Sequence, residues 1–323
     1  MINTIRAYIL VVASIFSLSV SAQDYAKVDA TVTSYPKSFD NPKNLSDRIK
    51  ADFKRDDERA RAAFTYIALN IKYDLAAYGK VTQPVGFSYT TPQERELKLK
   101  KMRDDLAAKT LRSKKGVCEG YATLYKVLCE DMGIQAEIIP GTSKSHPAHI
   151  GKAPGASDHA WNAVKIGNEW KLVDATWGAG TVTGEKPAFV FRFNDKYFFA
   201  DPDMFFLNHY PDDEKWLLAK HSKNEFAQLP LYYGAYHMSG YESVDPLPGT
   251  LQAKPSVIPV KIQNLQPGDR VGYAFSRDKS LKMVQPQFVG NVGEFSIPVD
   301  SGSAGTLTIY VNDKSVIAYR IMR

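Results

Sequence analysis

Two short apolar segments joined by a single dipeptide constrain the fold of this chain more than any other feature. Residues 160–166 and 169–175 are rich in aliphatic and aromatic side chains, and Gly167-Asn168 lies between them. This dipeptide is suited to a two-residue turn between antiparallel strands. The sequence therefore predicts a β-hairpin with one buried face.

The register of this hairpin brings two chemically useful side chains together. Counting outward from a two-residue turn pairs Trp161 with Asp174 and His159 with Thr176. Because successive side chains alternate between faces, His159 and Asp174 then share a face as diagonal neighbours, about 7 Å apart between Cα atoms. Provided that no β-bulge shifts the register, the carboxylate can orient the imidazole and fix its tautomer.

A helix with a cysteine at its start precedes the hairpin. Apolar residues recur at helical spacing, and Gly133 is suited to end the helix; the apolar positions are Val117, Tyr121, Leu124, Tyr125, Leu128 and Met132. The chain has two cysteines, Cys118 and Cys129, which lie about 16 Å apart if both are on this helix. A disulfide needs Cα atoms within about 7 Å, so we predict two free thiols.

Cys118 stands where a thiol becomes a nucleophile. A helix N-terminus and a nearby imidazolium both stabilise a thiolate. Gly116 and Gly120 bracket the cysteine, which permits a tight turn into the helix and close approach of a substrate backbone. The sequence thus predicts a triad of Cys118, His159 and Asp174.

The first 22 residues have the pattern of a secretory signal peptide. Arg6 precedes the apolar stretch 7–20, and Ala22 offers a small residue for cleavage before Gln23. The apolar stretch is shorter than the roughly 20 residues that span a bilayer. We expect an exported protein, periplasmic or extracellular, with no membrane span in the mature chain.

The charge balance is mildly basic. The formal net charge is +6, and it would fall to +5 on removal of the signal peptide, whose only charge is Arg6. This excess does not indicate a nucleic-acid partner. Residues 95–115 are strongly basic, which is typical of a solvated helix face, although they could also bias the following cysteine towards its thiolate.

The composition changes near the C-terminus. A Pro-, Gly- and Leu-containing linker occupies residues 246–255, and short alternating segments separated by turns follow it. This pattern is typical of a β-sandwich, here expected to be Ig-like. We expect a signal peptide at 1–22, a catalytic domain at 23–245 and a β-sandwich domain at 246–323.

Four motifs together resemble the transglutaminase-like superfamily, over about residues 45–220: 70–74, 116–122, 159–164 and 170–178. Residues 197–218 are similar to the kyphoscoliosis-peptidase-like branch, which includes bacterial exported members. The resemblance implies an α+β fold, with a papain-like core of helices packed on an antiparallel sheet. It also implies Cys118 as nucleophile, His159 as general base and acid, and Asp174 as the orienting group.

Other site residues stay open at this stage. Family members take an oxyanion-stabilising side chain from a segment upstream of the cysteine, where this chain offers Tyr73, Gln83 and Tyr89. We expect the site walls to comprise Trp161, Trp177, Gly116, Glu119, Gly120 and Tyr121. His146 and His149 lie in a loop that is either a simple surface loop or one that gates substrate or binds metal. With no carboxylate or cysteine cluster beside them, we assign no metal and no cofactor.

The triad specifies a cysteine thioester but not what resolves it. We favour hydrolysis of a peptide or amide bond, by a protease or amidase, with a protein or peptide as substrate and a cell-wall peptide as a further candidate. The alternatives are transfer to an amine, as in protein crosslinking, and a catalytically silent scaffold that keeps the fold.

Overall fold

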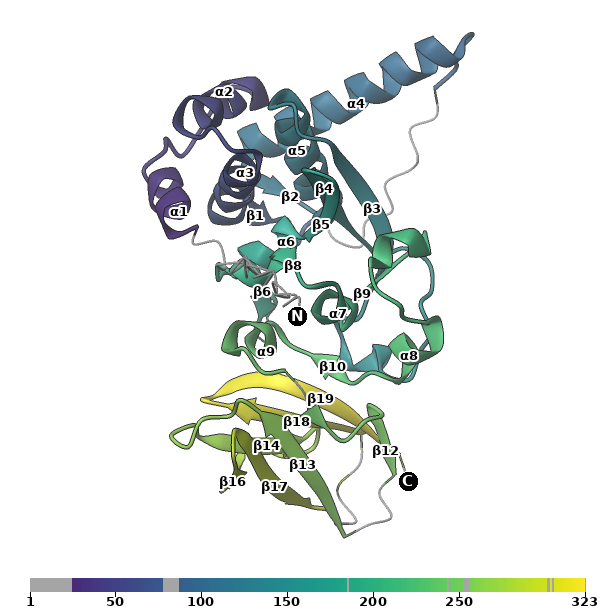
Figure 1. The fold of residues 1–323 in the computed structure, drawn as a ribbon. Helices are drawn as coiled ribbons and strands as arrows, with labels where there is room; N and C mark the ends of the chain where they lie inside the picture. Colours follow the sequence, from purple (N-terminus) through teal and green to yellow (C-terminus); the bar gives the residue numbers. More distant parts are fainter. Residues whose placement is uncertain are drawn as a thin grey trace, which may run out of the picture.

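The computed structural model describes residues 25–77, 87–184, 186–242, 244–252, 256–300, 303 and 305–322. Helices gather around one antiparallel sheet in an N-terminal lobe, and the C-terminal strands form a second lobe (Figure 1). The expected signal peptide lies outside the described residues. Within the part that is described, no helix has the length and apolar character needed to cross a membrane.

Local capping chemistry sets the starts of several helices. The Asn41 side chain accepts a hydrogen bond from the Asn44 N–H, Thr91 does the same for Glu94, and a proline follows each cap. The helices are α1 (Ala26–Thr33), α2 (Pro42–Asp52), α3 (Asp56–Asn70), α4 (Pro92–Ser113), α5 (Cys118–Asp131), α6 (Ala175–Ala179), α7 (Pro202–Phe206), α8 (Lys223–Gln228) and α9 (Gly234–Ser239), with 3₁₀ turns η1 (Pro147–His149), η2 (Asp195–Tyr197) and η3 (Glu214–Leu217).

A five-stranded antiparallel sheet forms the floor of this lobe, in the order β8-β5-β4-β3-β9. Its strands are β3 (Ala136–Ser143), β4 (His159–Ile166), β5 (Glu169–Val173), β8 (Phe198–Ala200) and β9 (His209–Pro211). Helix α5 packs on β3 and β4, and the Asn162 side chain on β4 donates a 3.0 Å hydrogen bond to the Ala122 carbonyl of α5. Buried side chains from the helices and the sheet make one core, so the α+β class is confirmed.

The predicted hairpin forms with the expected register near its turn. Ile166 pairs with Glu169, and the pairing continues to Asn162 and Val173. There β5 ends, because the Asp174 carboxylate accepts hydrogen bonds from two following backbone N–H groups and starts helix α6. The expectation that Trp161 faces Asp174 and His159 faces Thr176 across a strand pair is therefore wrong.

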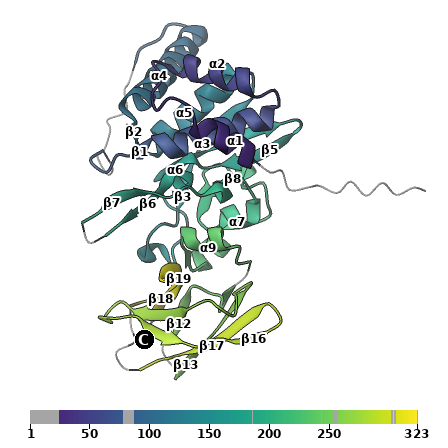
Figure 2. The ribbon, with the colours of Figure 1, turned by 90° about the vertical axis from the view of Figure 1, so that its left-hand side faces the viewer.

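Two small strand pairs flank the start of α5. Strand β1 (Lys72–Tyr73) runs parallel to β2 (Lys115–Gly116), which holds the chain just ahead of Cys118. Strands β6 (Gly180–Thr183) and β7 (Ala188–Phe191) form a hairpin that stands out from the lobe (Figure 2). Residues 78–86, between β1 and α4, lie outside the described part of the chain.

The C-terminal lobe consists of two sheets of mainly antiparallel strands that enclose a second core. One has the order β10-β19-β18-β14-β15, with β12 added parallel to β19, and the other has the order β11-β13-β17-β16. Buried side chains from both sheets form the core. The strands are β10 (Leu231–Tyr232), β11 (Val244–Asp245), β12 (Thr250–Gln252), β13 (Val257–Gln263), β14 (Val271–Phe275), β15 (Lys282–Val284), β16 (Gln287–Val289), β17 (Val292–Pro298), β18 (Gly305–Val311) and β19 (Lys314–Met322).

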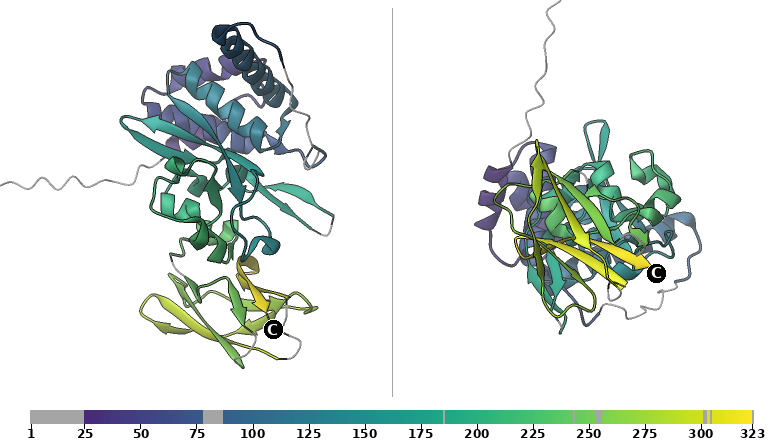
Figure 3. Two further views of the ribbon diagram at one scale, coloured as in Figure 1. Left: turned by 90° about the vertical axis from the view of Figure 1, so that its right-hand side faces the viewer. Right: turned by 90° about the horizontal axis from the view of Figure 1, so that it is seen from below.

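The two lobes meet along β19 (Figure 3). Strand β10 precedes the expected linker and pairs with β19, and the Tyr233 N–H donates a 2.9 Å hydrogen bond to Val316. Ile150, Leu231 and Ala318 form a small buried cluster at this junction. Residues ahead of position 246 therefore take part in the C-terminal sheets.

Candidate active site

Cys118 is the first residue of α5 and is partly exposed. Val117 before it is extended, and the β1–β2 pairing fixes how the chain turns into the helix. Cys129 is fully buried on the same helix, and both cysteines are free, as predicted. The first N–H groups of a helix have no partner within it, so the thiol lies at the positive end of α5.

The glycines around Cys118 serve helix packing. A Cβ at Gly120 would lie 2.8 Å from Oγ1 of Thr110 on α4, and a Cβ at Gly116 would lie 3.1 Å from Cγ2 of the same threonine. The Tyr121 hydroxyl is buried and donates to the Ile71 carbonyl. Gly120 and Tyr121, expected in the site wall, thus belong to the packing beneath the cysteine, whereas Glu119 is exposed beside it.

His159 and Asp174 form a buried hydrogen-bonded pair. Nε2 of His159 lies 2.7 Å from Oδ2 of Asp174. The other carboxylate oxygen, Oδ1, accepts the backbone N–H groups of Thr176 at 2.8 Å and Trp177 at 3.0 Å. The capping of α6 therefore holds the carboxylate that orients the histidine. Sequence reasoning found the pair but assigned Asp174 to a strand.

The charged groups of the site stabilise one another. Burial by itself favours a neutral His159 ring, but the Asp174 carboxylate and then Cys118 raise its pKa to about 10. Burial also opposes the charge on Asp174, yet His159 and a second histidine, His209, hold the pKa of this carboxyl well below its usual range. The arrangement favours an imidazolium between the cysteine and the carboxylate.

Two tryptophans enclose the His159 ring. The Trp161 ring centroid lies 5.9 Å from that of His159, and the Trp177 centroid lies 5.6 Å away. Trp161 is 1% exposed and lies beneath the histidine, whereas Trp177 is only partly buried. Trp177 therefore forms a wall of the site, and Trp161 forms its floor.

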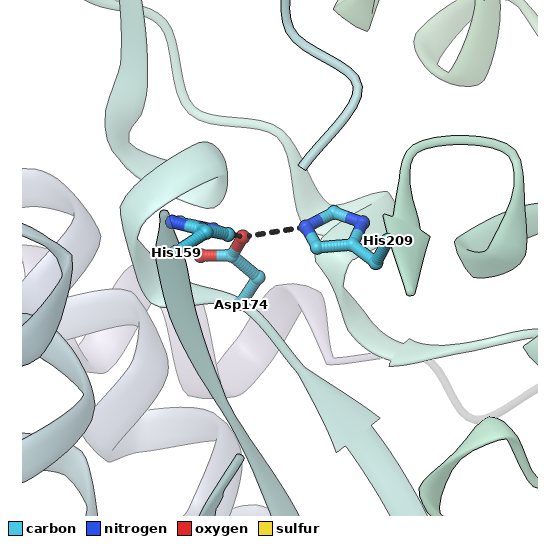
Figure 4. Close-up of side chains that lie close together, drawn as sticks. All are labelled: His159, Asp174 and His209. Carbon is cyan, nitrogen blue, oxygen red and sulfur yellow. Dashed lines mark hydrogen bonds and ion pairs between the residues drawn. The ribbon is translucent and has the colours of Figure 1, made fainter. Parts of the chain in front are cut away.

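A fourth residue, His209, lies against the carboxylate on the side away from His159 (Figure 4). Its Nε2 is 3.0 Å from the same Oδ2 atom that His159 contacts, and its side chain is fully buried. The sequence indicated no role for His209, although this residue lies within the segment 197–218 that is similar to the kyphoscoliosis-peptidase-like branch. Residue spacing could not predict this contact, because β9 comes close to Asp174 only by pairing with β3 at the edge of the sheet.

His159, Asp174 and His209 form the one group in the described residues whose donor atoms could hold a metal ion. Their Nε2–Oδ2 separations of 2.7 and 3.0 Å are those of direct hydrogen bonds. Two ligands of a tetrahedral zinc ion lie roughly 3.3 Å apart when each bond is about 2.0 Å long. The donor set is therefore arranged for hydrogen bonding, and the absence of a metal stays a prediction.

The three expected oxyanion donors differ in position. Tyr73 is on β1, where it pairs with Gly116, two residues before Cys118, and its ring lies 6.5 Å from that of Tyr121. Tyr89 is 52% exposed and lies near Arg95 at the start of α4. About 22 Å of helix separates Arg95 from Thr110, which packs beside Cys118, so Tyr89 is too distant to act there. Gln83 lies outside the described residues.

The remaining sequence features have structural roles. Charged side chains along α4 pair with one another at i,i+4 spacing, as in Lys100–Asp104 and Lys101–Asp105, which fits a solvated helix face. His146 accepts a hydrogen bond from the Ala148 N–H, and His149 accepts one from the Ser145 N–H. Both histidines thus stabilise the turn η1.

A helix-borne thiol beside a buried His–Asp pair defines the cysteine-nucleophile class of acyl-transfer sites. Residues 43–175 match the model of the Transglutaminase-like superfamily, so this part of the chain is a transglutaminase-like domain. Members of this superfamily typically carry out cysteine-dependent acyl transfer on protein or peptide substrates.

The chain is similar to several curated proteins. It is 30% identical over 258 residues to kyphoscoliosis peptidase of Homo sapiens, which covers 79% of this chain and 36% of that protein. It is 25% identical over 245 residues to hillarin of Drosophila melanogaster, covering 65% of this chain and 30% of that protein. The chain thus spans about a third of the length of the curated relatives it matches.

The chain also aligns with a solved structure described as "Crystal structure of a TGase". The alignment covers 57% of this chain and 40% of the chain in that structure, at 20% identity and a TM-score of 0.29. The fold assignment therefore depends on the family match and on the strands and helices themselves.

Proposed function

We propose that this protein is an exported cysteine-dependent hydrolase that cleaves peptide or amide bonds through a thioester on Cys118. The observation that carries the proposal is the 2.7 Å contact between His159 Nε2 and Asp174 Oδ2, with the Cys118 thiol at the start of α5 among the groups that act on the same ring. Export is supported by the signal-like sequence of residues 1–22.

In the first half-reaction the Cys118 thiolate attacks the carbonyl carbon, and the carbonyl π electrons move to oxygen. Backbone N–H groups at the start of α5 stabilise that oxyanion. The C–N bond then breaks as the His159 imidazolium gives its proton to the leaving amine. The products of this step are a thioester on Cys118, a free amine and a neutral His159.

In the second half-reaction the neutral His159 removes a proton from water, and the oxygen attacks the thioester. Collapse of this intermediate breaks the C–S bond and returns the electron pair to sulfur, which restores the thiolate and the imidazolium. Asp174 stays ionised throughout, because four hydrogen-bond donors surround its two oxygens. The partial exposure of Cys118 supports water as the acceptor.

The test is turnover of a peptide mixture by the full chain, followed by mass spectrometry. Cys118→Ala should abolish cleavage, and Cys129→Ala is the matched control because Cys129 is buried on the same helix. A new carboxylic acid indicates hydrolysis, whereas a new amide bond to an added amine indicates transfer. Cleavage that persists in Cys118→Ala would contradict the proposal.

Labelling separates an enzyme from a scaffold. Iodoacetamide should modify Cys118 at neutral pH and spare Cys129, because burial raises the pKa of the Cys129 thiol to about 12. Absence of Cys118 labelling would favour a silent scaffold. Trapping the acyl-enzyme from a protein lysate or a cell-wall digest would identify the substrate by the mass of the adduct.

A further inference from the structure

We propose that His209 is a positioning residue of this site: its Nε2–H fixes the Asp174 carboxylate and, through it, the catalytic His159. The proposal rests on the function proposed above. It assigns a chemical role to a buried histidine that the thioester mechanism does not otherwise use.

The contacts of Asp174 define this role. Oδ2 lies 2.7 Å from His159 Nε2 and 3.0 Å from His209 Nε2, while Oδ1 accepts two backbone N–H groups of α6. An ionised carboxylate has no proton to donate, so His209 must donate the hydrogen bond to Asp174. Without His209, the oxygen that faces the catalytic histidine would have no second donor.

The charge state of His209 suits a positioning role. Burial lowers its pKa, although the attraction of Asp174 opposes this. The titratable groups around the ring are Asp174, His159, His237 and Tyr197, whose ring centroid lies 6.2 Å away. A neutral His209 stabilises the carboxylate without a second positive charge that would compete with the His159 imidazolium.

The ring of His209 is held in one orientation. It stacks on Phe205 with centroids 3.9 Å apart and an interplanar angle of 16°. The rings of Trp161 and Trp177 lie 5.0 and 4.6 Å away. The donor therefore cannot swing away from Asp174 without disturbing the aromatic floor and wall of the site.

The preceding residue ties this segment to the C-terminal lobe. Nδ2 of Asn208 donates to the Lys144 carbonyl at 2.8 Å and to the Tyr232 carbonyl at 3.0 Å, and Oδ1 lies 2.9 Å from Nε2 of His237. Tyr232 is on β10, which pairs with β19 of the C-terminal sheet. The position of His209 is thus set from both lobes.

Two substitutions separate hydrogen bonding from packing. His209→Phe keeps an aromatic ring to stack on Phe205 but removes the donor. His209→Gln places an amide N–H near the position of Nε2 but removes the ring. His221→Phe is the matched control, because His221 also stacks on a phenylalanine at 3.9 Å and contacts a carboxylate at 2.8 Å, but at the surface.

The readout is the rate of Cys118 alkylation by iodoacetamide between pH 3 and 9, which needs no substrate. Without this donor the Asp174 carboxylate no longer holds the His159 ring firmly in place, so His209→Phe should lower the alkylation rate roughly tenfold across this range. It should also lower kcat/KM roughly tenfold to hundredfold on any peptide that the parent cleaves. His209→Gln should restore most of both losses, and His221→Phe should match the parent.

A His209→Phe variant that is alkylated as fast as the parent would overturn the proposal, as would a His209→Gln variant as impaired as the Phe variant. Thermal unfolding checks that each variant folds, and His209→Met replaces the Phe variant if the larger ring is not accommodated. If the parent alkylates normally but cleaves no peptide, the proposed function fails while the role of His209 is still measured.

Discussion

Replacing Asp174 with asparagine tests the electrostatics of the whole site. The amide keeps the size of the side chain and one acceptor oxygen, but it has no negative charge. If that oxygen still caps α6, the amide N–H₂ faces the two histidines and favours the wrong tautomer of His159. We expect Asp174→Asn to fold and to lose most of the reactivity of Cys118.

The magnitude follows from the pKa of His159. The site raises it from 6.5 to about 10, and at 1.36 kcal/mol per pKa unit this corresponds to roughly 5 kcal/mol of imidazolium stabilisation. Asp174 supplies the largest favourable part. Loss of most of it should lower kcat/KM by roughly a thousandfold or more.

The assay combines alkylation, turnover and unfolding. A folded-state pKa above the unfolded value means that His159 contributes stability below about pH 6.5 and loses it as the pH rises towards 10. The free energy of unfolding should therefore fall less over this window in Asp174→Asn than in the parent. Asp203→Asn is the matched control, because its contact with His221 is exposed and should contribute less than about 1 kcal/mol. An unchanged alkylation profile in Asp174→Asn would refute the reasoning.

Three further substitutions test the packing that supports the site, each by urea unfolding. Asn208→Ala should cost roughly 3–5 kcal/mol, because it leaves three buried partners unpaired, and a loss below 1 kcal/mol would contradict this. Burial lowers the pKa of Lys144 to about 8, so Lys144→Met should stabilise the protein by about 1–2 kcal/mol at pH 7. That gain should vanish near pH 10, and a less stable variant at pH 7 would be the contrary result. Gly141→Ala should cost roughly 2–3 kcal/mol, because its Cβ would collide with the Tyr210 carbonyl and the Trp161 ring, whereas Gly155→Ala, with open space around it, should be neutral.

The local elements of the core could be predicted because their signals are local. The apolar spacing of residues 117–132 and the glycine at 133 define α5 closely, and the turn at Gly167-Asn168 sets the register of β4 and β5. The prediction failed where a side chain competes with the strand. Asp174 caps α6 instead of continuing β5, since its carboxylate binds the backbone two and three residues ahead.

Short elements with tertiary support were also hard to predict. Residues Glu214–Leu217 form only the brief turn η3, and α8 and α9 carry no periodic signal because each spans fewer than two turns. Strand β10 lies ahead of the expected linker and takes its partner from the far end of the chain. No local pattern encodes such a pairing.

From the sequence alone we could place a thiol at a helix start, and a histidine and an aspartate close together on one hairpin. These three groups indicate the chemistry that the site can support. These follow from spacing within single elements, where backbone geometry relates position to direction. The four hydrogen-bond donors around Asp174, the distant position of Tyr89 and the contact of His209 with the site become visible only in the folded chain. His209 reaches Asp174 because β9 joins β3 at the edge of the sheet, a contact set by packing between segments that lie far apart in the chain.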